Sequence, residues 1–546
     1  MQNLHKYNNA LLFIPLGGTE EIGINLNVYH FRGKLLIVDC GSGFIHDVPG
    51  VRMVLPDISF LVQNEKKIVG AFITHSHEDH VGGLPYLLST ISCPLYATNF
   101  TANFIQAKLK EYSITAKINT IEPDTSFTLD PFHLTAISLT HSSPEMQALL
   151  IQTSQGNVLH TGDWKFDPGP LTGPQSNKKA LKHYAKQGIL ALVCDSTNAF
   201  SEGRSGSEEK VQECLSDIIQ KATGMILVTT FASNIARLEG LLMAAQQASK
   251  KVILLGKSML KIFNIGKDSG YFLESEDTVI NKKEASLFKR TELLILSTGC
   301  QGEKNAALSQ IVQKNHEIKL KANDTVIFSS KIIPGNEKAI YDIMNHLVKE
   351  DVKVISAHEA NVHTSGHPCQ EELKEMYSII KPQISVPVHG EPMHISKHAE
   401  LAQSFSVPKI IKVHNGSVVL LDKNNPDIIG NVKTRYLAID GNSVIPLSSP
   451  ILKERRTLTD SGAIVITLLL NKDRKLIKTP ILSTPGCLSD VTDKHLLESL
   501  LLNLSDIVKQ CNSKQSVISS STRYVTKFIK KELAKSPLVI VNVVTV

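Results

Sequence analysis

A chain of 546 residues with 42% hydrophobic content is long enough for roughly two or three domains, each with its own core. Its formal net charge of +6 permits a polyanionic partner without specifying one, and we expect the excess of Lys and Arg to be spread along the chain. The eight cysteines are dispersed without a Cys-x-x-Cys pair, and there is no export signal and no apolar stretch approaching ~18 residues. We therefore expect a cytoplasmic protein with reduced thiols and no membrane anchor, not a disulfide-stapled secreted domain.

The first 200 residues contain short apolar runs of strand length. Residues 11–14 and 35–38 are separated by glycine-rich turns, which predicts the start of an antiparallel sheet, and 69–74 form a further buried strand followed by helix signals at 83–88. Four more strands, each ending near a polar segment, are predicted at 134–138, 148–151, 157–160 and 190–194.

A polar stretch at 201–206 marks a boundary. Beyond it, helices alternate with strands of the parallel type, which predicts an α/β unit with strands at 225–228, 252–255, 293–296 and 326–328. A strand returns at 387–389. The last segment, from about residue 450, has the pattern of a small α+β domain with strands at 463–466 and 539–541 and a helix at 496–508.

The segment that follows the strand 69–74 carries a dense cluster of metal-ligand residue types. His75, His77, Asp79 and His80 lie within six residues and offer the imidazole and carboxylate groups that bind Zn²⁺ or Mn²⁺. Without a cation, such groups crowded behind a buried strand repel one another or require desolvation. The cluster therefore predicts a metal site.

Two later segments supply further ligands for a second cation. A dinuclear site needs an anion that bridges cations held ~3.5–4 Å apart. His141 follows the strand 134–138, and Asp163 follows the strand 157–160, so they offer an imidazole and a bridging carboxylate. A histidine such as His141, taken singly, is more often a surface or core residue than a metal ligand.

Together these segments resemble the metallo-β-lactamase superfamily, whose hydrolases share the motif H-x-H-x-D-H with a distal His and Asp at strand ends. The resemblance implies an αββα sandwich. It also implies one metal held by His75, His77 and His141, and a second held by Asp79, His80 and a further histidine. Asp163 would lie between the two metals, and Asp39 would orient a ligand histidine from behind.

Segments beyond Asp163 resemble the β-CASP branch of that superfamily, which acts on nucleic acids. Asp195, His367 and His389 match its three motifs, and His389 completes the second metal set. Within the branch, the chain is similar to the ribonuclease J family over nearly its whole length, through the segments 162–167, 231–234, 297–303, 333–337 and 381–391. The chain departs from that family's pattern at Cys300, at Lys304-Asn305 and at residues 359–361, none of which is a predicted ligand.

The resemblance divides the chain into domains and places the inserted α/β unit as a β-CASP domain. The expected division is 1–204 for the first part of the metallo-β-lactamase domain, 205–355 for the β-CASP domain, 356–430 for the return to the first domain, 431–449 for a linker and 450–546 for a C-terminal α+β domain.

The resemblance also implies the activity. We expect a ribonuclease with two Zn²⁺ or Mn²⁺ ions, which lower the pKa of bound water and neutralise the phosphate under attack. His367 is the candidate that protonates the departing 3′ oxygen, with Asp195 holding its tautomer. The family implies 5′→3′ exonuclease and endonuclease activity in mRNA turnover and rRNA maturation. It also implies that the chain binds RNA, forms a homodimer or homotetramer and associates with other RNA-decay proteins.

A pocket for a 5′-monophosphate is the family feature that confers direction. Ser233, Asn234, His363 and Ser365 occupy the matching positions. A hydroxyl, an amide and an imidazole are suited to a phosphate. Ser233 and Asn234 are equally suited to capping a helix over 235–238.

Other functions are compatible with parts of the sequence. A DNA-processing nuclease of the same fold commonly lacks a histidine at the position of His389. A catalytically inactive RNA-binding subunit is expected to have a broken ligand set, and none of the positions is broken here. A thioesterase or lactamase does not explain the inserted domain. Solvated helix and loop faces explain the basic residues at 453–456 and 527–531, although contact with RNA is the alternative. The apolar stripe at 496–508 fits the core of a helical packing, with a subunit interface as the alternative.

Overall fold

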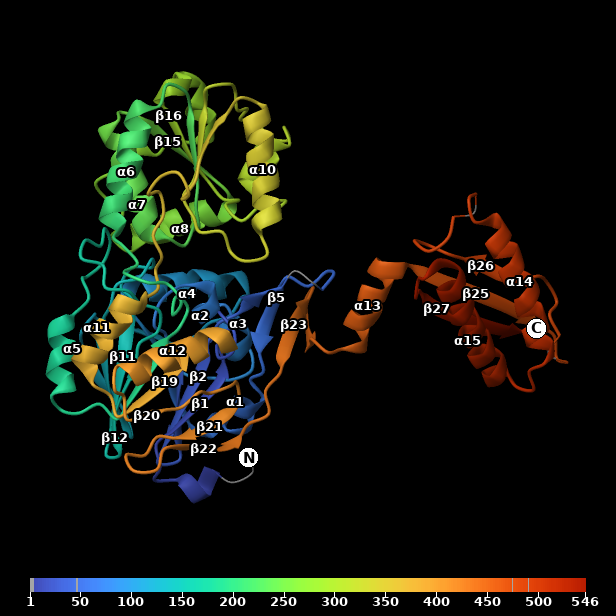
Figure 1. Ribbon diagram of the computed structural model, residues 1–546, viewed down its shortest axis with the longest axis horizontal. Coiled ribbons are helices and arrows are strands. Elements are labelled where there is room, and N and C mark those ends of the chain that lie inside the picture. The colour runs from blue at the N-terminus through green and yellow to red at the C-terminus, as the bar shows by residue number, and fades with distance from the viewer. Residues whose placement is uncertain (1–3, 46–47, 474, 490) are drawn as a thin grey trace. The chain divides into compact units, whose positions relative to one another are not determined.

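The structure is a computed structural model that describes residues 4–45, 48–473, 475–489 and 491–546. It divides into two compact units, which are Met1–Gly43 with Leu55–Thr434 and Phe44–Val54 with Arg435–Val546 (Figure 1). We call them unit 1 and unit 2. Within the described ranges, no helix has the length and apolar character needed to span a bilayer.

Two mixed β-sheets form the centre of unit 1. The eight-stranded sheet contains, in order, β22 (Asp427–Asn431), β21 (Ser417–Leu420), β1 (Leu12–Gly17), β2 (Leu26–Phe31), β3 (Lys34–Val38), β6 (Ile68–Phe72), β7 (Leu95–Ala97) and β8 (Ile118–Thr120). The seven-stranded sheet contains β20 (Lys409–Ile410), β19 (Ile384–Val388), β13 (Ala191–Asp195), β12 (Gly156–His160), β11 (Gln147–Thr153), β10 (Phe132–Ser138) and β9 (Ser126–Leu129). The antiparallel start predicted for the chain is confirmed, because β2 pairs antiparallel with both β1 and β3.

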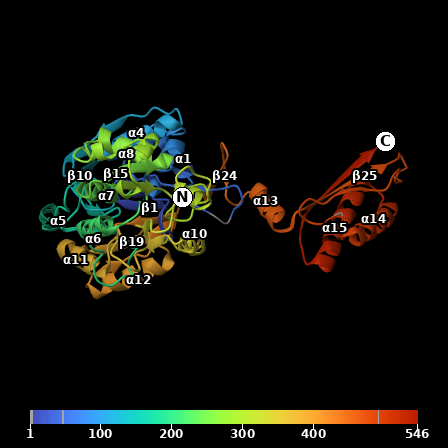
Figure 2. The same ribbon diagram turned by 90° about the horizontal axis from the view of Figure 1, so that it is seen from above.

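Alternating apolar residues bury both faces of each sheet. One core lies between the sheets, where Phe13, Tyr29 and Phe72 face Leu134 and Val193. On the outer face of the first sheet lie α1 (Ser59–Gln63), α3 (Leu84–Leu88) and α4 (Asn99–Glu111), and on that of the second lie α5 (Lys178–Ala185), α11 (Gln370–Ile380) and α12 (Pro392–Ser404). Figure 2 shows α4 and the pair α11 and α12 on opposite sides. The expected αββα sandwich is confirmed.

The inserted domain is built on a parallel five-stranded sheet, as its alternating pattern predicts. Its strands are, in order, β15 (Lys251–Leu255), β16 (Leu293–Ser297), β14 (Ile226–Thr229), β17 (Thr325–Phe328) and β18 (Lys353–Ile355). The covering helices are α6 (Glu208–Lys221), α7 (Ile235–Gln247), α8 (Lys257–Asp268), α9 (Ala307–Val312) and α10 (Glu337–Lys349). The chain then returns to the sandwich, where β19 pairs with β13 in parallel (Figure 1).

Buried ion pairs join the insert to the sandwich where the chain leaves and returns. Asp167 accepts from Lys165 Nζ at 2.9 Å and from the backbone N–H of Glu208 at 3.0 Å. Glu208 in turn pairs with Arg237 at 3.0 Å, and Arg237 Nη1 donates to the carbonyl of Val362 at 2.9 Å. Removing one partner of such a pair leaves an uncompensated buried charge, which costs about 3–5 kcal/mol. The network therefore holds the return segment, which carries His363 to His367, at a defined place.

Unit 2 contains a small α+β domain. Its sheet has the order β26 (Ile481–Ser483), β25 (Ala463–Leu470) and β27 (Leu538–Thr545), and α14 (Lys494–Lys509) and α15 (Lys514–Leu533) cover one face of it. Leu500 and Val508 of the predicted apolar stripe are buried in this core. The domain begins with α13 (Pro450–Ser461).

The segment 431–449, which we expect to be a linker, contains regular structure. β23 (Tyr436–Asp440) and β24 (Ser443–Pro446) form an antiparallel hairpin, and β4 (Gly43–Phe44) and β5 (Met53–Pro56) extend it to four strands. The hairpin is anchored by Asp440, which accepts two bonds of 2.9 Å from the guanidinium of Arg455 in α13. The strands of this hairpin are short, and their stability depends on partners distant in sequence. The local pattern therefore does not predict them.

Candidate metal centre

The candidate ligands lie where strands of the two sheets end. His75 and His77 follow β6, and the short helix α2 (Glu78–Val81) adds Asp79 and His80. His141 follows β10, Asp163 follows β12, Asp195 ends β13 and His389 follows β19. Since β12, β13 and β19 are parallel neighbours, their carboxyl ends lie at one edge of the sheet and bring the last three residues together.

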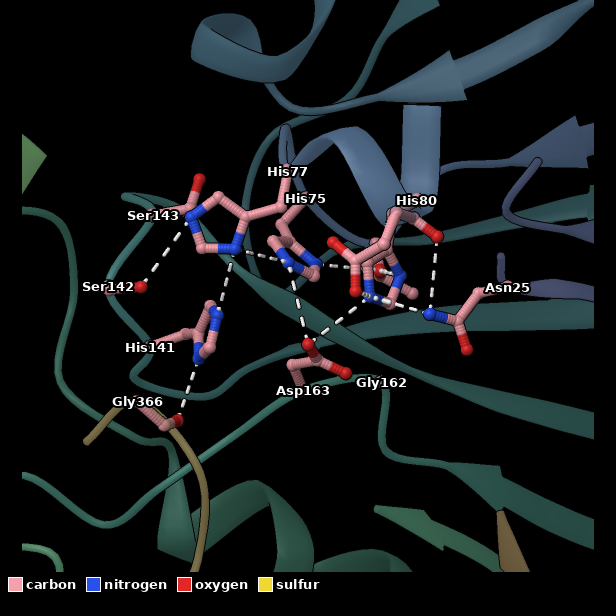
Figure 3. Close-up of polar contacts among 12 residues, drawn as sticks. Asn25, His75, His77, His80, His141, Ser142, Ser143, Gly162, Asp163 and Gly366 are labelled. Atoms are coloured by element: carbon pink, nitrogen blue, oxygen red, sulfur yellow. Dashed lines mark hydrogen bonds and ion pairs between the residues drawn. The ribbon is translucent and has the colours of Figure 1, made fainter. Parts of the chain in front are cut away.

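His75, His77 and His141 form a first cluster, which we call the three-histidine group. Its ligand nitrogens all lie within 4.8 Å of one another. His77 Nδ1 lies 3.1 Å from His75 Nε2 and 3.1 Å from His141 Nε2 (Figure 3). Figure 3 shows the three rings converging from two segments, with Asp163 below them.

The histidines of this group are held neutral. Burial is the main cause that lowers the pKa of His75 and of His141, and the neighbouring imidazoles lower both further. Burial also lowers the pKa of His77, against the opposing effect of Asp79. Neutral imidazoles present lone pairs, which is the form that binds a cation.

Asp79, His80, Asp163 and His389 form a second cluster, which we call the mixed group. Their ligand atoms also lie within 4.8 Å of one another. Asp163 Oδ2 is 3.2 Å from His80 Nε2 and 4.0 Å from His75 Nε2, so it faces both groups. Asp79 Oδ2 is 3.2 Å from His389 Nε2. The mixed group thus combines two carboxylates with two imidazoles.

The electrostatics of the mixed group are opposite to those of the three-histidine group. Burial acts to lower the pKa of His80 and of His389, but nearby carboxylates, chiefly Asp163, outweigh it and raise both well above the usual value. Burial likewise opposes the charge of Asp79 and Asp163, yet the histidines lower the pKa of both carboxyl groups. The carboxylates are therefore ionised and hold the adjacent imidazoles in the protonated form.

Two ligand histidines are oriented by one carboxylate behind them. Asp39 Oδ2 accepts from Nδ1–H of His80 at 2.8 Å, which turns His80 Nε2 toward Asp163. Thr74 donates its hydroxyl to Asp39, so the Thr74 oxygen accepts from Nδ1–H of His75 at 3.0 Å. Asp39 therefore fixes the tautomer of His80 directly and that of His75 through Thr74.

Two further histidines are oriented by residues far away in the sequence. Nδ1–H of His141 donates to the carbonyl oxygen of Gly366 at 2.7 Å (Figure 3). The hydroxyl of Thr197 donates to the carbonyl of His389 at 3.2 Å, so its oxygen accepts from Nδ1–H of the same residue at 2.8 Å. Both contacts leave Nε2 facing the cluster.

Backbone geometry supports this arrangement at three positions. Asp39 and His389 directly follow strands and have left-handed φ values of 63° and 51°, which are uncommon outside glycine and concentrate at functional sites. Gly366 approaches His141 so closely that a Cβ would lie 2.6 Å from its Cε1. Only glycine fits at this position without displacing the ring.

The residues fit a pair of divalent cations. Asp163 Oδ1 is buried without a hydrogen-bond partner among the described residues, although a buried carboxylate oxygen normally has one. Around it, imidazole nitrogens approach one another at 3.1 Å with their other nitrogens already engaged. An ion in each group would satisfy all of these atoms, and the mixture of N and O ligands suits Zn²⁺ or Mn²⁺.

His367 and Asp195 form a hydrogen-bonded pair beside the mixed group. Nδ1–H of His367 donates to Asp195 Oδ2 at 2.8 Å, and the His367 ring stacks on that of His389 with centroids 5.6 Å apart. Burial acts to lower the pKa of His367, but Asp195 and then Asp163 outweigh it and raise it. The side chain is 21% exposed, so its free Nε2 can reach a ligand.

The four residues expected at a 5′-phosphate lie on two segments. Asn234 caps α7, since its side-chain oxygen accepts from the backbone N–H of Arg237 at 2.9 Å, and Ser233 precedes it. The bond from Arg237 to the carbonyl of Val362 brings the neighbouring His363 to this helix. Ser365 accepts from Asn198 at 2.8 Å, on the side of His367. The side-chain oxygen of Asn234 therefore caps α7, as the helix-cap interpretation predicts.

His363 lies in basic surroundings. Burial, Arg237, Lys331 and Lys165 lower its pKa to about 3, so the ring is neutral, and its Nδ1 is buried without a partner within the described ranges. Arg237 and Lys165 are already paired with carboxylates, whereas Lys331 is exposed and has no carboxylate within ion-pair distance in that part of the chain. The positive field and the helix N-terminus suit an anion.

Three residues of the site were not found by sequence reasoning. Thr197, Gly366 and Lys331 act through contacts with residues that are distant along the chain. Thr197 and Gly366 lie within two residues of the predicted Asp195 and His367, and that proximity was the one signal available.

Four family models match successive segments of the chain. A beta-lactamase superfamily domain matches 35–175, the beta-CASP domain of ribonuclease J 223–347, a Zn-dependent metallo-hydrolase RNA specificity domain 351–414 and the ribonuclease J C-terminal domain 450–546. The chain is 38% identical to a ribonuclease J of Sinorhizobium meliloti over 87% of this chain and 85% of the relative. It is 33% identical to a ribonuclease J 1 of Streptococcus pyogenes, covering 100% of this chain and 99% of the relative.

A solved structure shares the fold alone. A protein of unknown function from Enterococcus faecalis superposes with a TM-score of 0.53 and 16% identity, covering 75% of this chain and 100% of that one.

Proposed function

The chain belongs to the ribonuclease J family, and from that premise we propose that it hydrolyses RNA phosphodiester bonds as a 5′→3′ exonuclease that also cuts internally. One observation carries the proposal. Two adjacent clusters of metal-ligand residues, joined by Asp163, lie next to a histidine–aspartate pair in which His367 Nδ1 and Asp195 Oδ2 are 2.8 Å apart. That combination matches hydrolysis of a phosphodiester with protonation of the leaving group.

The metal ions would be two Zn²⁺, with Mn²⁺ as the alternative that the same ligands accept. His75, His77 and His141 would hold one, Asp79, His80 and His389 the other, and Asp163 would face both. When bound, such ions activate a water for attack and neutralise the phosphate.

His367 supplies the proton for the departing 3′ oxygen. Asp195 and Asp163 raise its pKa against the effect of burial, which favours the protonated ring, and its Nε2 is free because Nδ1 is engaged by Asp195. Asp195 holds the ring in place and stays ionised, since its own pKa is lowered by His367 against the effect of burial. The products are a 5′-phosphate and a 3′-hydroxyl.

Direction comes from a pocket for a 5′-monophosphate near Ser233, Asn234, His363 and Ser365. The neutral His363 ring, the basic residues around it and the N-terminus of α7 support binding of a phosphate at the end of the substrate. Lys331 adds a free cation at the same place. We expect a triphosphate, which carries more charge and bulk, to bind here less well.

The remaining proposals concern the setting. The cysteines of the described chain are all free thiols, which favours action in the cytoplasm. We expect the protein to act in mRNA turnover and rRNA maturation, as a homodimer or homotetramer and together with other RNA-decay proteins.

The test compares three RNAs of the same sequence: one with a 5′-monophosphate, one with a 5′-triphosphate and one closed into a circle. We expect rapid one-nucleotide release from the first, slow release from the second and internal cuts in the third. Activity that survives a strong chelator contradicts the metal mechanism. Equal release from both linear RNAs contradicts the pocket.

A His363→Gln variant separates direction from chemistry. Because His363 belongs to neither metal-ligand group, we expect the preference for the monophosphate end to fall about tenfold while cleavage of the circular RNA stays within about twofold of wild type. If both activities fall together, His363 supports the fold of the return segment instead.

A further inference from the structure

The basic residues are not evenly distributed, which corrects the expectation drawn from the whole-chain charge. Residues 450–546 contain 15 Lys and Arg against 8 Asp and Glu, a formal net charge of +7, whereas the entire chain carries +6. The first 449 residues, which include the metal centre, are therefore close to neutral overall. The whole basic excess belongs to the C-terminal domain, and a local excess of this kind attracts a polyanion.

Within that domain, a groove of about 320 Å³ lies between α14 and α15. One wall is the C-terminal end of α14 with the residue that follows the helix, and the other is a face of α15. The lining side chains are Ile507, Gln510, Cys511, Ser516, Ser520, Arg523, Tyr524 and Lys527. Apart from Ile507 and Cys511, each of them offers a hydrogen-bonding or charged group.

The two cations of the groove are unengaged. Arg523 and Lys527 are exposed, and neither has a carboxylate within ion-pair distance in the part of the domain that the structure describes. They are four residues apart on α15, one helical turn or about 6 Å along the axis. The nearby Asp506 is paired with Lys509 at 2.8 Å, so it does not cancel their charge.

The groove also contains an aromatic platform. Tyr524 lies between the two cations in sequence, is half-buried, and packs against Phe528 with ring centroids 5.8 Å apart. A row of hydroxyl and amide groups with two cations and one tyrosine matches the needs of single-stranded RNA, whose phosphates accept bonds and whose bases stack on aromatic rings. A protein partner would be expected to require a more apolar centre.

We propose that the groove between α14 and α15 is a second RNA-binding surface, which holds the single-stranded backbone of the substrate through Arg523 and Lys527. This inference rests on RNA being the substrate. It assigns to the C-terminal domain a role in substrate retention that is separate from the chemistry, since no residue of the two metal-ligand groups lies in this domain. Binding at the groove therefore does not require metal.

The test uses the full chain and a 3′-fluorescent, unstructured RNA in the presence of chelator, so that binding is measured without cleavage. In the double variant Arg523→Gln/Lys527→Gln, we expect the affinity at low salt to fall about tenfold. We also expect the slope of log affinity against log salt to become shallower by about 1.4, because about 0.7 is lost for each phosphate contact with a single strand.

A matched control removes the same amount of charge outside the groove, at one residue of α14 and one of α15. Lys494 and Lys531 are exposed and do not line the groove. In the double variant Lys494→Gln/Lys531→Gln, the affinity should stay within about twofold of wild type, and the salt slope within about 0.3. Equal losses in the two double variants overturn the proposal in favour of diffuse charge, and no loss in either overturns it outright.

Three further readouts keep the outcomes distinct. The unfolding midpoint of each variant must match wild type, since both changed pairs are exposed. Molar mass by light scattering must also be unchanged, and a loss of oligomers on groove substitution would make the groove a subunit contact and overturn the proposal. Hydrolysis of a dinucleotide should stay at the wild-type rate, because the changed residues belong to neither metal-ligand group. If wild type does not cleave RNA at all, the proposed activity fails while the binding result still stands.

Discussion

The three-histidine group and the mixed group use similar ligand atoms a few ångströms apart, yet their electrostatics are opposite. The first contains no carboxylate of its own, and burial keeps its imidazoles neutral. In the second, Asp79 and Asp163 raise the pKa of His80 and His389, so the imidazoles hold protons when no cation is present. A cation entering the mixed group must displace these protons, whereas one entering the three-histidine group meets free lone pairs.

The difference indicates how two adjacent ligand groups could each take a cation without mutual exclusion. The negative charge that offsets the second ion is concentrated in the mixed group. It reaches the first group through Asp163, 4.0 Å from His75 Nε2, and through the effect of Asp79 on His77. We therefore expect the groups to lose metal independently when changed singly and together when Asp163 is changed.

The largest effect is expected at Asp163. Asp163→Asn removes the negative charge that both groups share while keeping the volume, so turnover should fall by at least about 10⁴-fold. Metal analysis of the purified variant should give well below one ion per chain. Retention of about two ions per chain would show that Asp163 is not shared.

His77→Ala should act on one group alone. Because His77 Nδ1 lies 3.1 Å from both other nitrogens of the three-histidine group, its loss should abolish measurable turnover, about 10³-fold or more. We expect metal content to fall from about two ions to about one, with an unchanged unfolding midpoint in chelator. A fall to zero would contradict independent groups.

Gly366→Ala tests the same group from behind. The added Cβ would displace His141, whose Nδ1–H donates to the Gly366 carbonyl, so we expect turnover to fall about 10–100-fold. Raising the metal concentration should restore turnover, because the His141 ligand is displaced and not absent. Wild-type turnover at low metal concentration would show that the return segment moves aside at no cost.

Thr197 provides the matching test of the mixed group. Thr197→Val keeps the shape but removes the acceptor for Nδ1–H of His389, so we expect the affinity of this group for its ion to fall about 10–100-fold. Thr197→Ser retains the hydroxyl and should remain close to wild type. Calorimetric titration with Zn²⁺ measures the affinity of each group. If the two variants bind Zn²⁺ equally tightly, Thr197 does not orient His389.

The smallest effect is expected at a histidine outside both groups, which serves as a reference for what burial alone does. His398 is fully buried between Ser196 and Tyr377, and burial lowers its pKa to about 4. Since its pKa is about 6.5 in the unfolded chain, its contribution is fully present above pH 6.5 and is lost as the pH falls from 6.5 toward 4, by about 3 kcal/mol at most.

His398→Gln keeps an amide at the same place and does not titrate. We expect it to lower the unfolding midpoint at pH 7 but to reduce the dependence on pH between about 6.5 and 4. Urea unfolding at a series of pH values, in chelator, checks this. If the stability of the variant depends on pH as strongly as that of wild type, groups other than His398 cause the loss of stability in acid.

Much of the fold could be predicted because the signals are local. Strands such as β3 and β10 are runs of apolar residues bounded by turns, and the parallel insert follows from its alternation with helices. The hairpin at β23 and β24 could not be predicted, because its strands are short and gain their stability from a bidentate pair with Arg455. The groove in unit 2 likewise depends on how α14 and α15 pack.

The sequence by itself determined which residue types gather at the site, because His75 to His80 are neighbours and the remaining ligands directly follow strands. Only the tertiary structure decided which nitrogen of each histidine faces the cluster. That choice depends on Asp39, Thr197 and Gly366, and the last two contact ligands 192 and 225 residues away. A local pattern can encode the residue types at a strand end, but the partner of a buried N–H is set by packing between segments that the sequence does not place side by side.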